Sequence, residues 1–325
     1  MKKHFTFLLF LILIIVFDSC SGGSSPQTLP VDQFLNPGDY YKSIDVDGFK
    51  RTFLVHIPDG YSLTVSHSVV FALHGGGGSA DKMVKLTKGG FNTLSEKDKF
   101  LVIYPEAIEN HWNDGRGLDN YYSQRGNVDD VKFLSQLIDY CVKEYKVSPH
   151  RVYFTGMSNG ALMCFRLISE LSDKITAIAP VCGSIPENIF PNYNPQYPLS
   201  VLIINGTDDP LVPWDGGEIT FGDLKLGEVL PIEQVFDYLG EAFVCAESLE
   251  REYLPDVSPE DGTRVWLETY VSCKNNVVVT LCGIEGGGHT WPSGYHYLPE
   301  SIVGRTSLDI DGCDFIWDFF KDKVR

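Results

Sequence analysis

Six short apolar runs constrain the fold of this chain more than any other feature. They lie at residues 69–73, 101–104, 152–155, 175–181, 201–204 and 277–281. Segments that are hydrophobic on both faces are typical of strands in a parallel sheet, because helices cover both sides of such a sheet. The runs therefore predict a set of buried parallel strands.

Amphipathic helices are predicted between these runs. From Val131 to Tyr145 the apolar residues recur at three and four positions, and Asp129 and Asp130 stand at the start, where the helix dipole favours anions. A second helix is expected over about 159–171. Alternating strands and helices predict an α/β fold with a mainly parallel sheet.

A hairpin is expected near the start of the folded part of the chain. Asp47-Gly48 forms a turn signal, and it precedes a half-buried alternating strand with Phe49, Phe53, Val55 and Ile57. We assign residues 40–325 to one domain. Residues 214–264 are less regular and rich in Gly, Pro and acids, so we interpret them as an insertion that covers one edge of the sheet.

The first 20 residues predict an export signal. A basic start precedes an apolar run from Phe5 to Phe17 that is short for a membrane span. The run ends at Cys20, and the polar segment 21–39 is typical of a flexible tether. This arrangement resembles the lipobox of bacterial lipoproteins, so we expect export across the inner membrane and lipidation of Cys20, with an anchor in the periplasm or at the cell surface. Asp18 and Phe17 differ from the usual lipobox residues, which leaves ordinary signal cleavage as the alternative.

The charge of the chain excludes several kinds of partner. The formal net charge is -17 and the pI is about 4.8, with no Lys/Arg cluster. Proteins that bind nucleic acid usually carry a basic patch. We therefore expect no nucleic-acid partner, and contact with a membrane only through the lipid anchor.

The cysteines do not form a metal-binding pattern. Seven remain after Cys20, which is an odd number for an oxidising compartment, so at least one is unpaired. The chain has no C-x-x-C and no H-E-x-x-H, and we predict no metal. Cys141 and Cys164 lie within apolar helical patterns, where buried free thiols are expected.

The segment G-M-S-N-G at 156–160 is the strongest chemical signal. It joins a predicted strand to a predicted helix, where Gly156 and Gly160 permit a sharp turn that lifts the Ser158 hydroxyl above the sheet. A serine needs a base to take its proton and a carboxylate to orient that base. In this arrangement the acid and then the histidine follow the serine along the chain.

Few residues can complete such a triad. Only His289 and His296 follow Ser158, and His289 lies in a glycine loop after the predicted strand 277–281. The acid is expected after the strand 201–204, where Asp208 and Asp209 stand together. One of the two would orient the histidine, and the other would cap a turn.

The glycine run at 73–80, L-H-G-G-G-G-S-A, has two interpretations. From Gly75 it reads G-x-G-x-x-A, which is close to a dinucleotide-binding fingerprint. From His74 it reads H-G-G-G, the loop that binds the oxyanion in lipases and esterases. The serine turn and the export signal favour the oxyanion loop, because an exported chain leaves the cytosolic nicotinamide pool.

Six motifs in this order resemble a known family. They are HGGGGSA, WNDGRG, VDDVKFL, GMSNGA, NGTDDPLVPW and GGGHTWP. Together they are similar to the polyhydroxybutyrate depolymerase and feruloyl esterase family, which includes acetyl xylan esterases, and the resemblance covers about residues 40–325. It implies an α/β-hydrolase fold, with the insertion lying between the acid and the histidine.

The resemblance also implies roles for individual residues. Ser158 would be the nucleophile, His289 the base and Asp209 the orienting acid, with the backbone amides of Gly76 and Asn159 as oxyanion donors. Trp112 and Asp114 either contact substrate or brace their loop, and Trp291 either forms an aromatic wall or packs in the core. Cys245 and Cys273 match a paired couple in the family.

These features predict a secreted serine esterase that requires no cofactor. Feruloylated or acetylated polysaccharide fragments are the preferred substrates, and short polyester oligomers are the alternative. The chain ends soon after a helix with Phe315 and Trp317, without a polymer-binding module, so a soluble substrate is expected. A glycan-binding surface lipoprotein without catalysis is the alternative from another class. A prolyl-oligopeptidase-type peptidase would need a large additional domain.

Overall fold

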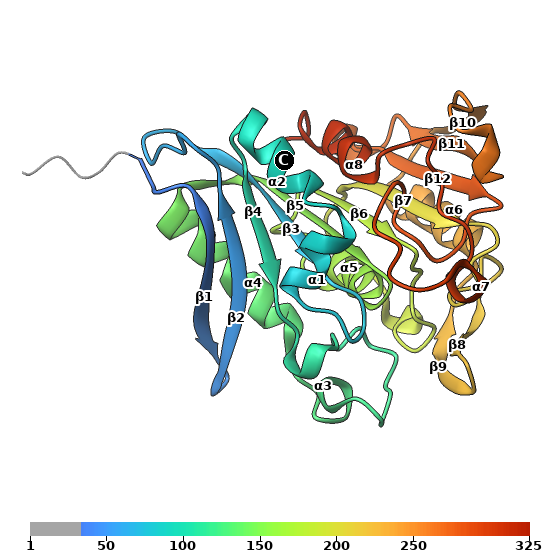
Figure 1. The fold of residues 1–325 in the computed structure, drawn as a ribbon, viewed down its shortest axis with the longest axis horizontal. Coiled ribbons are helices and arrows are strands. Elements are labelled where there is room, and N and C mark those ends of the chain that lie inside the picture. Colours follow the sequence, from blue (N-terminus) through green and yellow to red (C-terminus); the bar gives the residue numbers. More distant parts are fainter. Residues whose placement is uncertain (1–33) are drawn as a thin grey trace, which may run out of the picture. The chain divides into compact units, whose positions relative to one another are not determined.

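The computed structural model describes residues 34–325, which form one unit built on a ten-stranded sheet (Figure 1). The strand order is β1-β2-β4-β3-β5-β6-β7-β12-β11-β10. The six strands from β4 to β12 in this order pair in parallel, and an antiparallel strand pair extends each edge. The predicted α/β-hydrolase architecture with a mainly parallel sheet is confirmed.

Each of the six apolar runs forms a central strand. The strands are β3 (His67–Leu73), β4 (Leu101–Pro105), β5 (Val147–Met157), β6 (Ala177–Val181), β7 (Ser200–Gly206) and β12 (Val279–Glu285). Almost every residue in the apolar part of these strands is buried. Burial on both faces is the reason that the runs are continuous rather than alternating.

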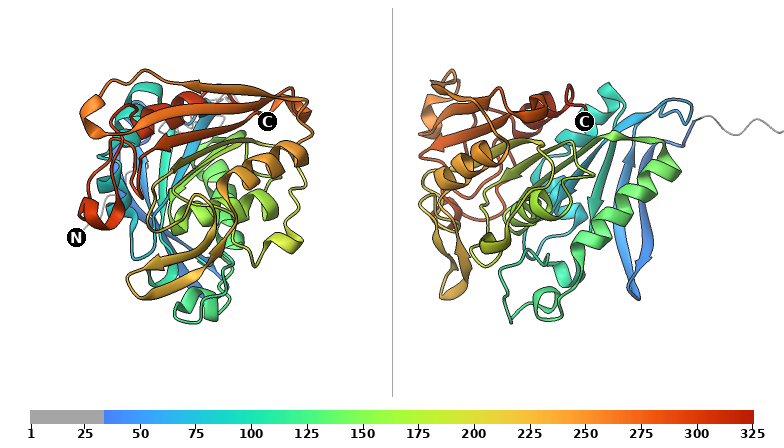
Figure 2. Two further views of the ribbon diagram at one scale, coloured as in Figure 1. Left: turned by 90° about the vertical axis from the view of Figure 1, so that its right-hand side faces the viewer. Right: turned by 180° about the vertical axis from the view of Figure 1, so that it is seen from behind.

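Helices cover both faces of this sheet (Figures 1 and 2). On one face lie α4 (Asp130–Tyr145), α5 (Asn159–Glu170) and α6 (Ile232–Ala242), and on the other lie α1 (Ala80–Leu86), α2 (Gly90–Asp98) and α8 (Gly312–Phe320). Two short helices, α3 (Tyr122–Arg125) and α7 (Glu300–Val303), lie in loops. Successive residues of one strand face opposite layers: Phe71 belongs to the first core and Val70 to the second.

The helix predicted over 131–145 begins at Asp130, and the side chain of Asp129 caps it by accepting a hydrogen bond from the Lys132 amide at 2.8 Å. Asp130 does more than complement the helix dipole. Its buried carboxylate forms an ion pair with Arg51 at 2.6 Å, which ties the start of α4 to β2.

The N-terminal hairpin consists of β1 (Gly38–Val46) and β2 (Phe49–Ile57), with the turn at Asp47-Gly48 as predicted. Two details differ from expectation. Residues 34–39, which we assigned to the tether, belong in the structure to the fold, because Phe34 pairs with Ser62 and β1 begins at Gly38. Phe49 is exposed rather than half-buried, and it is the first residue of β2, next to the turn.

The insertion at 214–264 is more regular than predicted. It contains the hairpin β8 (Gly217–Phe221) and β9 (Leu224–Val229), then α6, then β10 (Glu247–Tyr253), which pairs with β11 (Arg264–Val271) at the edge of the main sheet. The glycines that suggested irregular structure occupy left-handed positions in and beside the β8–β9 hairpin, at Gly216, Gly217, Gly222 and Gly227. The glycines of this segment therefore indicate tight turns and bends within regular structure, and not the absence of regular structure.

Within residues 34–325, no helix is both long enough and apolar enough to cross a membrane. The predicted export signal, most of the tether and Cys20 lie outside the described residues.

Candidate active site

A cavity of about 740 Å³ lies at the carboxyl ends of the parallel strands. Its lining includes Gly75–Gly78 after β3, Ser158 after β5, and His289 in the loop after β12. Ligands bind at this edge of open α/β sheets because loops from separate strands meet there. The fold thus brings together candidate residues that are far apart in the chain.

Ser158 lies on a sharp turn between β5 and α5. It has φ 56° and ψ -121° and is half-buried, and a non-glycine residue rarely adopts such a positive φ. A Cβ atom on Gly160 would lie 2.5 Å from the carbonyl oxygen of Leu73. Gly160 therefore has to be glycine, because the start of α5 passes directly against the end of β3.

His289 is paired with one of the two candidate acids. Its Nδ1 lies 2.7 Å from Oδ2 of Asp209, and both side chains are buried. The other carboxylate oxygen of Asp209 accepts hydrogen bonds from the backbone amides of Leu211 and Val212 at 2.8 and 2.9 Å. Asp208 is exposed, and its carboxylate accepts a hydrogen bond from the Thr207 hydroxyl. The alternative that the sequence left open is thus resolved geometrically: Asp209 contacts the histidine.

Close packing of two loops makes this pairing possible. A Cβ atom on Gly206, at the end of β7, would lie 2.2 Å from the carbonyl oxygen of Gly287. The amide of Asp208 donates a hydrogen bond to the same oxygen at 2.9 Å. The glycines thus let the acid loop and the histidine loop meet.

Ser158 and His289 line the same cavity. Within the described part of the chain, the Ser158 hydroxyl has no hydrogen bond to the imidazole. Such bonds are often long before a substrate is bound and tighten in the reacting complex.

The two predicted oxyanion donors lie at the same cavity. Gly76 belongs to its lining, and within residues 34–325 its amide has no hydrogen-bond acceptor. Asn159 also lines the cavity and is the first residue of α5, so its amide has no acceptor inside the helix. Both amides are thus available to a ligand.

Two buried histidines shape the glycine loop. Burial lowers the pKa of His74 to about 4, and the neutral ring donates from Nδ1 to the Gly75 carbonyl at 2.8 Å and accepts the Ala107 amide at Nε2 at 3.1 Å. Burial likewise lowers the pKa of His111 to about 4. The His111 ring stacks on Tyr121 with centroids 3.6 Å apart and lies against Gly76.

Trp112 and Asp114 brace the site and do not line the cavity. Trp112 is fully buried and donates from Nε1 to the His74 carbonyl at 2.9 Å. Asp114 accepts a hydrogen bond from the Asn159 side chain at 2.6 Å and pairs with Arg116 at 2.8 Å. Burial alone would raise the pKa of Asp114, but Arg116 holds it below its usual range. Of the two roles predicted for this loop, the structure supports bracing.

Trp291 is also a core residue, so of the two roles predicted for it the structure supports core packing. It is 2% exposed, packs edge to face against Phe91 and lies outside the cavity lining. The chain turns after His289, so a residue two positions later points into the layer under α8. His296 is exposed and does not line the cavity either.

The sequence analysis missed several residues of the cavity. The β8–β9 hairpin contributes Ile219, Phe221, Leu224 and Leu226, while Lys82 and Lys85 come from α1 and Arg116 from the WNDGRG loop. Alternating hydrophobic residues around Gly222 could have indicated a hairpin. No local signal indicates that it borders the cavity, because that depends on tertiary packing.

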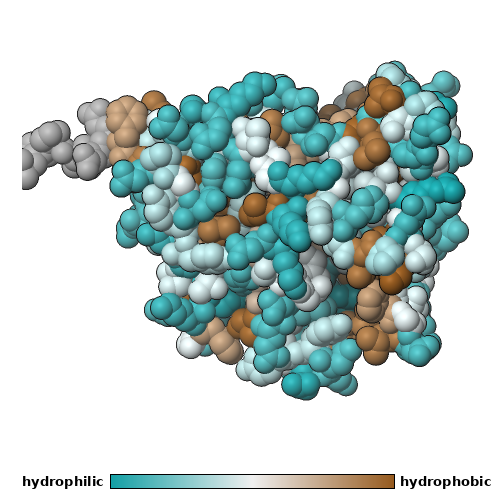
Figure 3. Space-filling view, viewed as in Figure 1, coloured by the Kyte–Doolittle hydropathy of each residue, from teal (hydrophilic) through white to brown (hydrophobic). Residues whose placement is uncertain are grey.

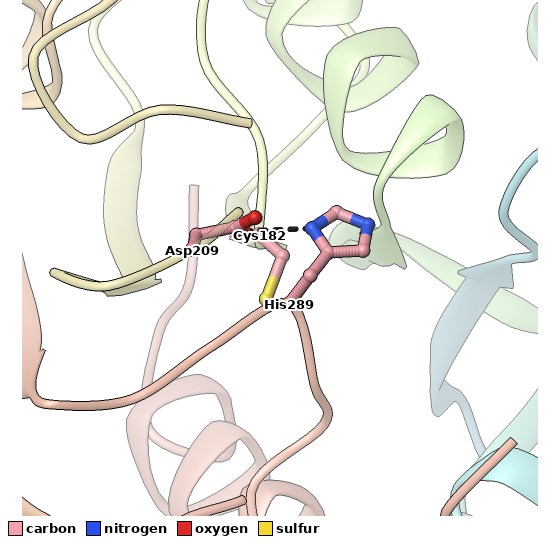
Figure 4. Close-up of side chains that lie close together, drawn as sticks. All are labelled: Cys182, Asp209 and His289. Atoms are coloured by element: carbon pink, nitrogen blue, oxygen red, sulfur yellow. Dashed lines mark hydrogen bonds and ion pairs between the residues drawn. The ribbon is translucent and has the colours of Figure 1, made fainter. Parts of the chain in front are cut away.

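Cys182 lies beside the His289–Asp209 pair (Figure 4). Ligand atoms of these three residues lie within 4.8 Å of one another, which is close enough for a metal ion. Burial raises the pKa of the Cys182 thiol, and its Sγ lies 3.3 Å from the Thr290 carbonyl, to which it donates. Metal binding requires a thiolate, so these residues fit a paired acid and base better than a metal centre.

A disulfide joins Cys245 and Cys273, as the resemblance implied. It links the segment after α6 to the segment after β11, close to the edge of the sheet. The free cysteines within the described residues, Cys141, Cys164, Cys182, Cys282 and Cys313, are all buried.

Comparison with known proteins supports an esterase. A family profile described as esterase PHB depolymerase matches residues 51–185, which contain the glycine loop and the serine turn. The chain is an esterase, and this segment of it is similar to the PHB depolymerase esterases.

Relatives of this esterase have related names. NocK of Nocardia uniformis subsp. tsuyamanensis, which is named as an esterase, is 28% identical over 86% of this chain and 81% of its own length. The bifunctional acetylxylan esterase/xylanase XynS20E of Neocallimastix patriciarum is 25% identical over 82% of this chain, and the match spans 32% of that protein. Feruloyl esterase B of Piromyces equi is 29% identical over 50% of this chain and 29% of its own length.

A solved structure supports the fold of this esterase. The acetyl xylan esterase from Aspergillus awamori matches 87% of this chain and 99% of its own, with a TM-score of 0.55 and 14% identity. The likeness extends beyond the segment that the family profile matches, and it confirms the α/β-hydrolase fold for the whole described domain.

Proposed function

We propose that this esterase works through a covalent acyl-enzyme on Ser158. The Ser158 oxygen attacks the ester carbonyl carbon while His289 Nε2 takes the hydroxyl proton. The negative oxygen that develops on the carbonyl would accept hydrogen bonds from the Gly76 and Asn159 amides. The alcohol then leaves with the proton from His289, and water, activated by the same imidazole, releases the acid and restores the serine.

The pairing of His289 with Asp209 carries this proposal. A carboxylate on Nδ1 leaves Nε2 as the nitrogen that can accept a proton. Each oxyanion donor typically lowers the barrier by about 3 kcal/mol, because it points at charge that exists only in the transition state.

We further propose that the acyl group is bulky, with feruloyl esters of polysaccharide fragments as the preferred substrates. The cavity of about 740 Å³ is in the range that holds drug-sized ligands, far larger than an acetyl group needs. The hairpin side chains Ile219, Phe221 and Leu226 in its lining offer an apolar surface to an aromatic ring. Polyester oligomers are the second candidate, because the family profile includes PHB depolymerases.

The experiment that tests the mechanism compares the esterase with its Ser158→Ala variant on methyl ferulate, acetylated xylan and a hydroxybutyrate oligomer. We expect acid release from methyl ferulate above all, and a loss of at least about 10⁴-fold in kcat in the variant. Ser248→Ala, on the exposed strand β10, is the matched control and should retain full activity. A fluorophosphonate should label the parent and the control but not Ser158→Ala.

The same experiment tests the alternative that the protein binds glycans without catalysis. If Ser158→Ala equals the parent in both glycan binding and acid release, that alternative is favoured. If acid is released only from acetylated xylan or only from the hydroxybutyrate oligomer, the proposed serine mechanism still holds, but the feruloyl ester is not the substrate.

We also propose export and lipidation at Cys20. The supporting observation is the sequence of the first 20 residues, which lie outside the described part of the structure. Metabolic labelling with palmitate should mark the chain expressed in bacteria and fail to mark Cys20→Ser. Labelling that persists in the variant, or that is absent from both, would contradict lipidation at this residue.

A further inference from the structure

The cavity differs in charge from the rest of the molecule. The chain contains 43 acidic and 26 basic residues, yet no aspartate or glutamate of the described residues lines the cavity. Its lining includes three cations, Lys82, Lys85 and Arg116. A positive cavity in a strongly acidic protein attracts an anion that the remaining surface would repel.

One of these cations is already neutralised. Arg116 pairs with the buried carboxylate of Asp114 and donates to the Leu226 carbonyl at 2.7 Å. Its charge holds the WNDGRG loop against the hairpin, so it is not free for a ligand.

The two lysines keep their charges available. Within residues 34–325, neither has a carboxylate within ion-pair distance, whereas Lys132, Lys174 and Lys225 all do. Lys82 Nζ donates to the Gly77 carbonyl at 2.8 Å, and Lys85 Nζ lies 4.2 Å above the Tyr295 ring. A neutral carbonyl and an aromatic face leave both ammonium groups with unused donors.

Two carboxylates lie near the lysines in sequence or in space. Asp81 precedes both lysines on α1 and is exposed, and Glu106 accepts the Ala80 amide at 3.0 Å. Neither of these carboxylates belongs to the cavity lining. The two lysines are spaced three residues apart on α1, so they lie on one face of that helix.

We propose that Lys82 and Lys85 bind a carboxylate of the substrate, so that this esterase selects anionic esters. The proposal rests on the esterase function of the same cavity. It makes the two lysines specificity determinants that act away from the scissile bond.

The remainder of the lining fits an ester with one apolar and one charged part. The β8–β9 hairpin and α1 occupy separate parts of the molecule in Figure 1, and both contribute to the one cavity. In Figure 3 hydrophobic residues gather over the region of the hairpin, where Phe221 and Leu224 are exposed. A substrate could therefore place its apolar group against the hairpin and its carboxylate against α1.

Two classes of ester carry such a carboxylate. One is an acylated sugar fragment that contains a uronic acid, and the other is a hydroxyacid oligomer with a free acid end. Both present the same chemistry to the lysines, so substrates of both classes are needed, each compared with its methyl ester.

The primary test uses two matched ester pairs. In the first, a 4-acyloxybenzoate and its methyl ester differ in a carboxylate on the alcohol side. In the second, 4-nitrophenyl hydrogen glutarate and its methyl ester differ on the acyl side. We expect kcat/KM to favour the carboxylate member of at least one pair by about three- to thirtyfold, which is what two exposed ion pairs supply.

The variants are Lys85→Gln and Lys82→Gln/Lys85→Gln. The preference, taken as the ratio of kcat/KM within each pair, should fall in the single variant and vanish in the double variant. The single variant keeps the contact between Lys82 and the glycine loop, so a folding defect in the double variant would not obscure the result. Lys97→Gln, an exposed lysine of α2 outside the lining, is the control and should behave as the parent.

Salt and binding provide independent readouts. Raising the salt from about 0.02 M to about 0.5 M should reduce the preference, because exposed charges are screened over that range. Calorimetric binding of the same pairs to Ser158→Ala measures the anion site without turnover. The proposal is overturned if that variant binds both members equally, or if a preference persists without the lysines. If the parent hydrolyses none of the esters but the protein still binds the carboxylate members selectively, only the proposed esterase mechanism is contradicted, and the anion site remains supported.

Discussion

At the scale of single residues, the contrast between Asp208 and Asp209 shows how backbone geometry assigns a role. The two carboxyls are adjacent in sequence, but one is exposed and the other is buried against His289. The amides of Leu211 and Val212 hold Asp209 in place. Its carboxylate is therefore directed at the imidazole before any substrate arrives, which is what an orienting acid requires.

Asp209→Asn should separate these two carboxyls by activity. The amide keeps the shape of the side chain but favours the wrong tautomer of His289, so we expect kcat to fall by about 10³- to 10⁴-fold with a small change in KM. Asp208→Asn is the neighbouring control and should remain within about twofold of the parent. Equal losses in both variants, measured by steady-state kinetics, would show that the buried pairing is not the basis of activity.

The lowered pKa of His74 predicts a pH-dependent stability. An unfolded histidine titrates near pH 6.5, whereas burial lowers the pKa of folded His74 to about 4. Between these values the unfolded state binds the extra proton, so stability is present above pH 6.5 and is lost as the pH falls toward 4. Each such histidine contributes a slope of up to about 1.4 kcal/mol per pH unit.

Urea unfolding at several pH values measures this slope. His74→Gln should be less stable at pH 7, because its contacts to Gly75 and Ala107 are altered, and its slope below pH 6.5 should be shallower. The exposed His150→Gln is the control and should keep the slope of the parent. An unchanged slope in His74→Gln would mean that His74 is not the group that titrates.

At the scale of elements, the insertion between the acid and the histidine supplies both a wall of the cavity and an edge of the sheet. The β8–β9 hairpin borders the cavity, α6 adds to the main core, and β10, whose residues are all exposed, forms the edge strand of the sheet. Arg116 links the hairpin to the WNDGRG loop through the Leu226 carbonyl. One insertion therefore connects a wall of the cavity to the scaffold.

The disulfide at the edge of this insertion should affect stability more than catalysis. It closes a segment of 28 residues, for which chain entropy predicts about 3 to 4 kcal/mol. Cys245→Ser/Cys273→Ser should lower the free energy of unfolding by roughly this amount and keep kcat on a soluble ester near that of the parent. Reductant should lower the free energy of unfolding of the parent, and it should do so equally in the control variant Cys141→Ser, which keeps the bridge. A parent protein whose stability does not change with reductant would argue against the bridge.

At the scale of the whole molecule, the sheet separates two hydrophobic layers. Phe154 of β5 packs in the layer with α4 and α5 and stacks on Phe71 at 4.5 Å. Phe91 of α2 packs in the opposite layer against Trp291. Residues that share no neighbours across a sheet contribute independently to stability.

Substitutions in the two layers should therefore be additive. Phe154→Leu and Phe91→Leu should each lower the free energy of unfolding by about 1 to 2 kcal/mol, and the double variant should equal the sum within about 0.5 kcal/mol. Denaturant unfolding of the four proteins measures the coupling. A larger deviation would mean that the layers respond to each other through the sheet.

Local patterns were sufficient to predict much of this protein. The six continuous apolar runs predicted the central strands, since burial on both faces leaves no polar positions. The glycines around Ser158 predicted the sharp turn, because the backbone there cannot accommodate a Cβ atom. Chain order narrowed the base to two histidines and the acid to two neighbouring carboxyls.

Only the tertiary structure decided the rest. Which carboxyl meets His289, whether Trp112 and Trp291 face substrate or core, and which side chains of α1 and the hairpin line the cavity all depend on how distant segments pack. The residues adjacent in sequence do not distinguish a tryptophan that lines a cavity from one that is buried in the core. Their difference lies in neighbours that are far away in the chain, and those neighbours exist only after the sheet has assembled.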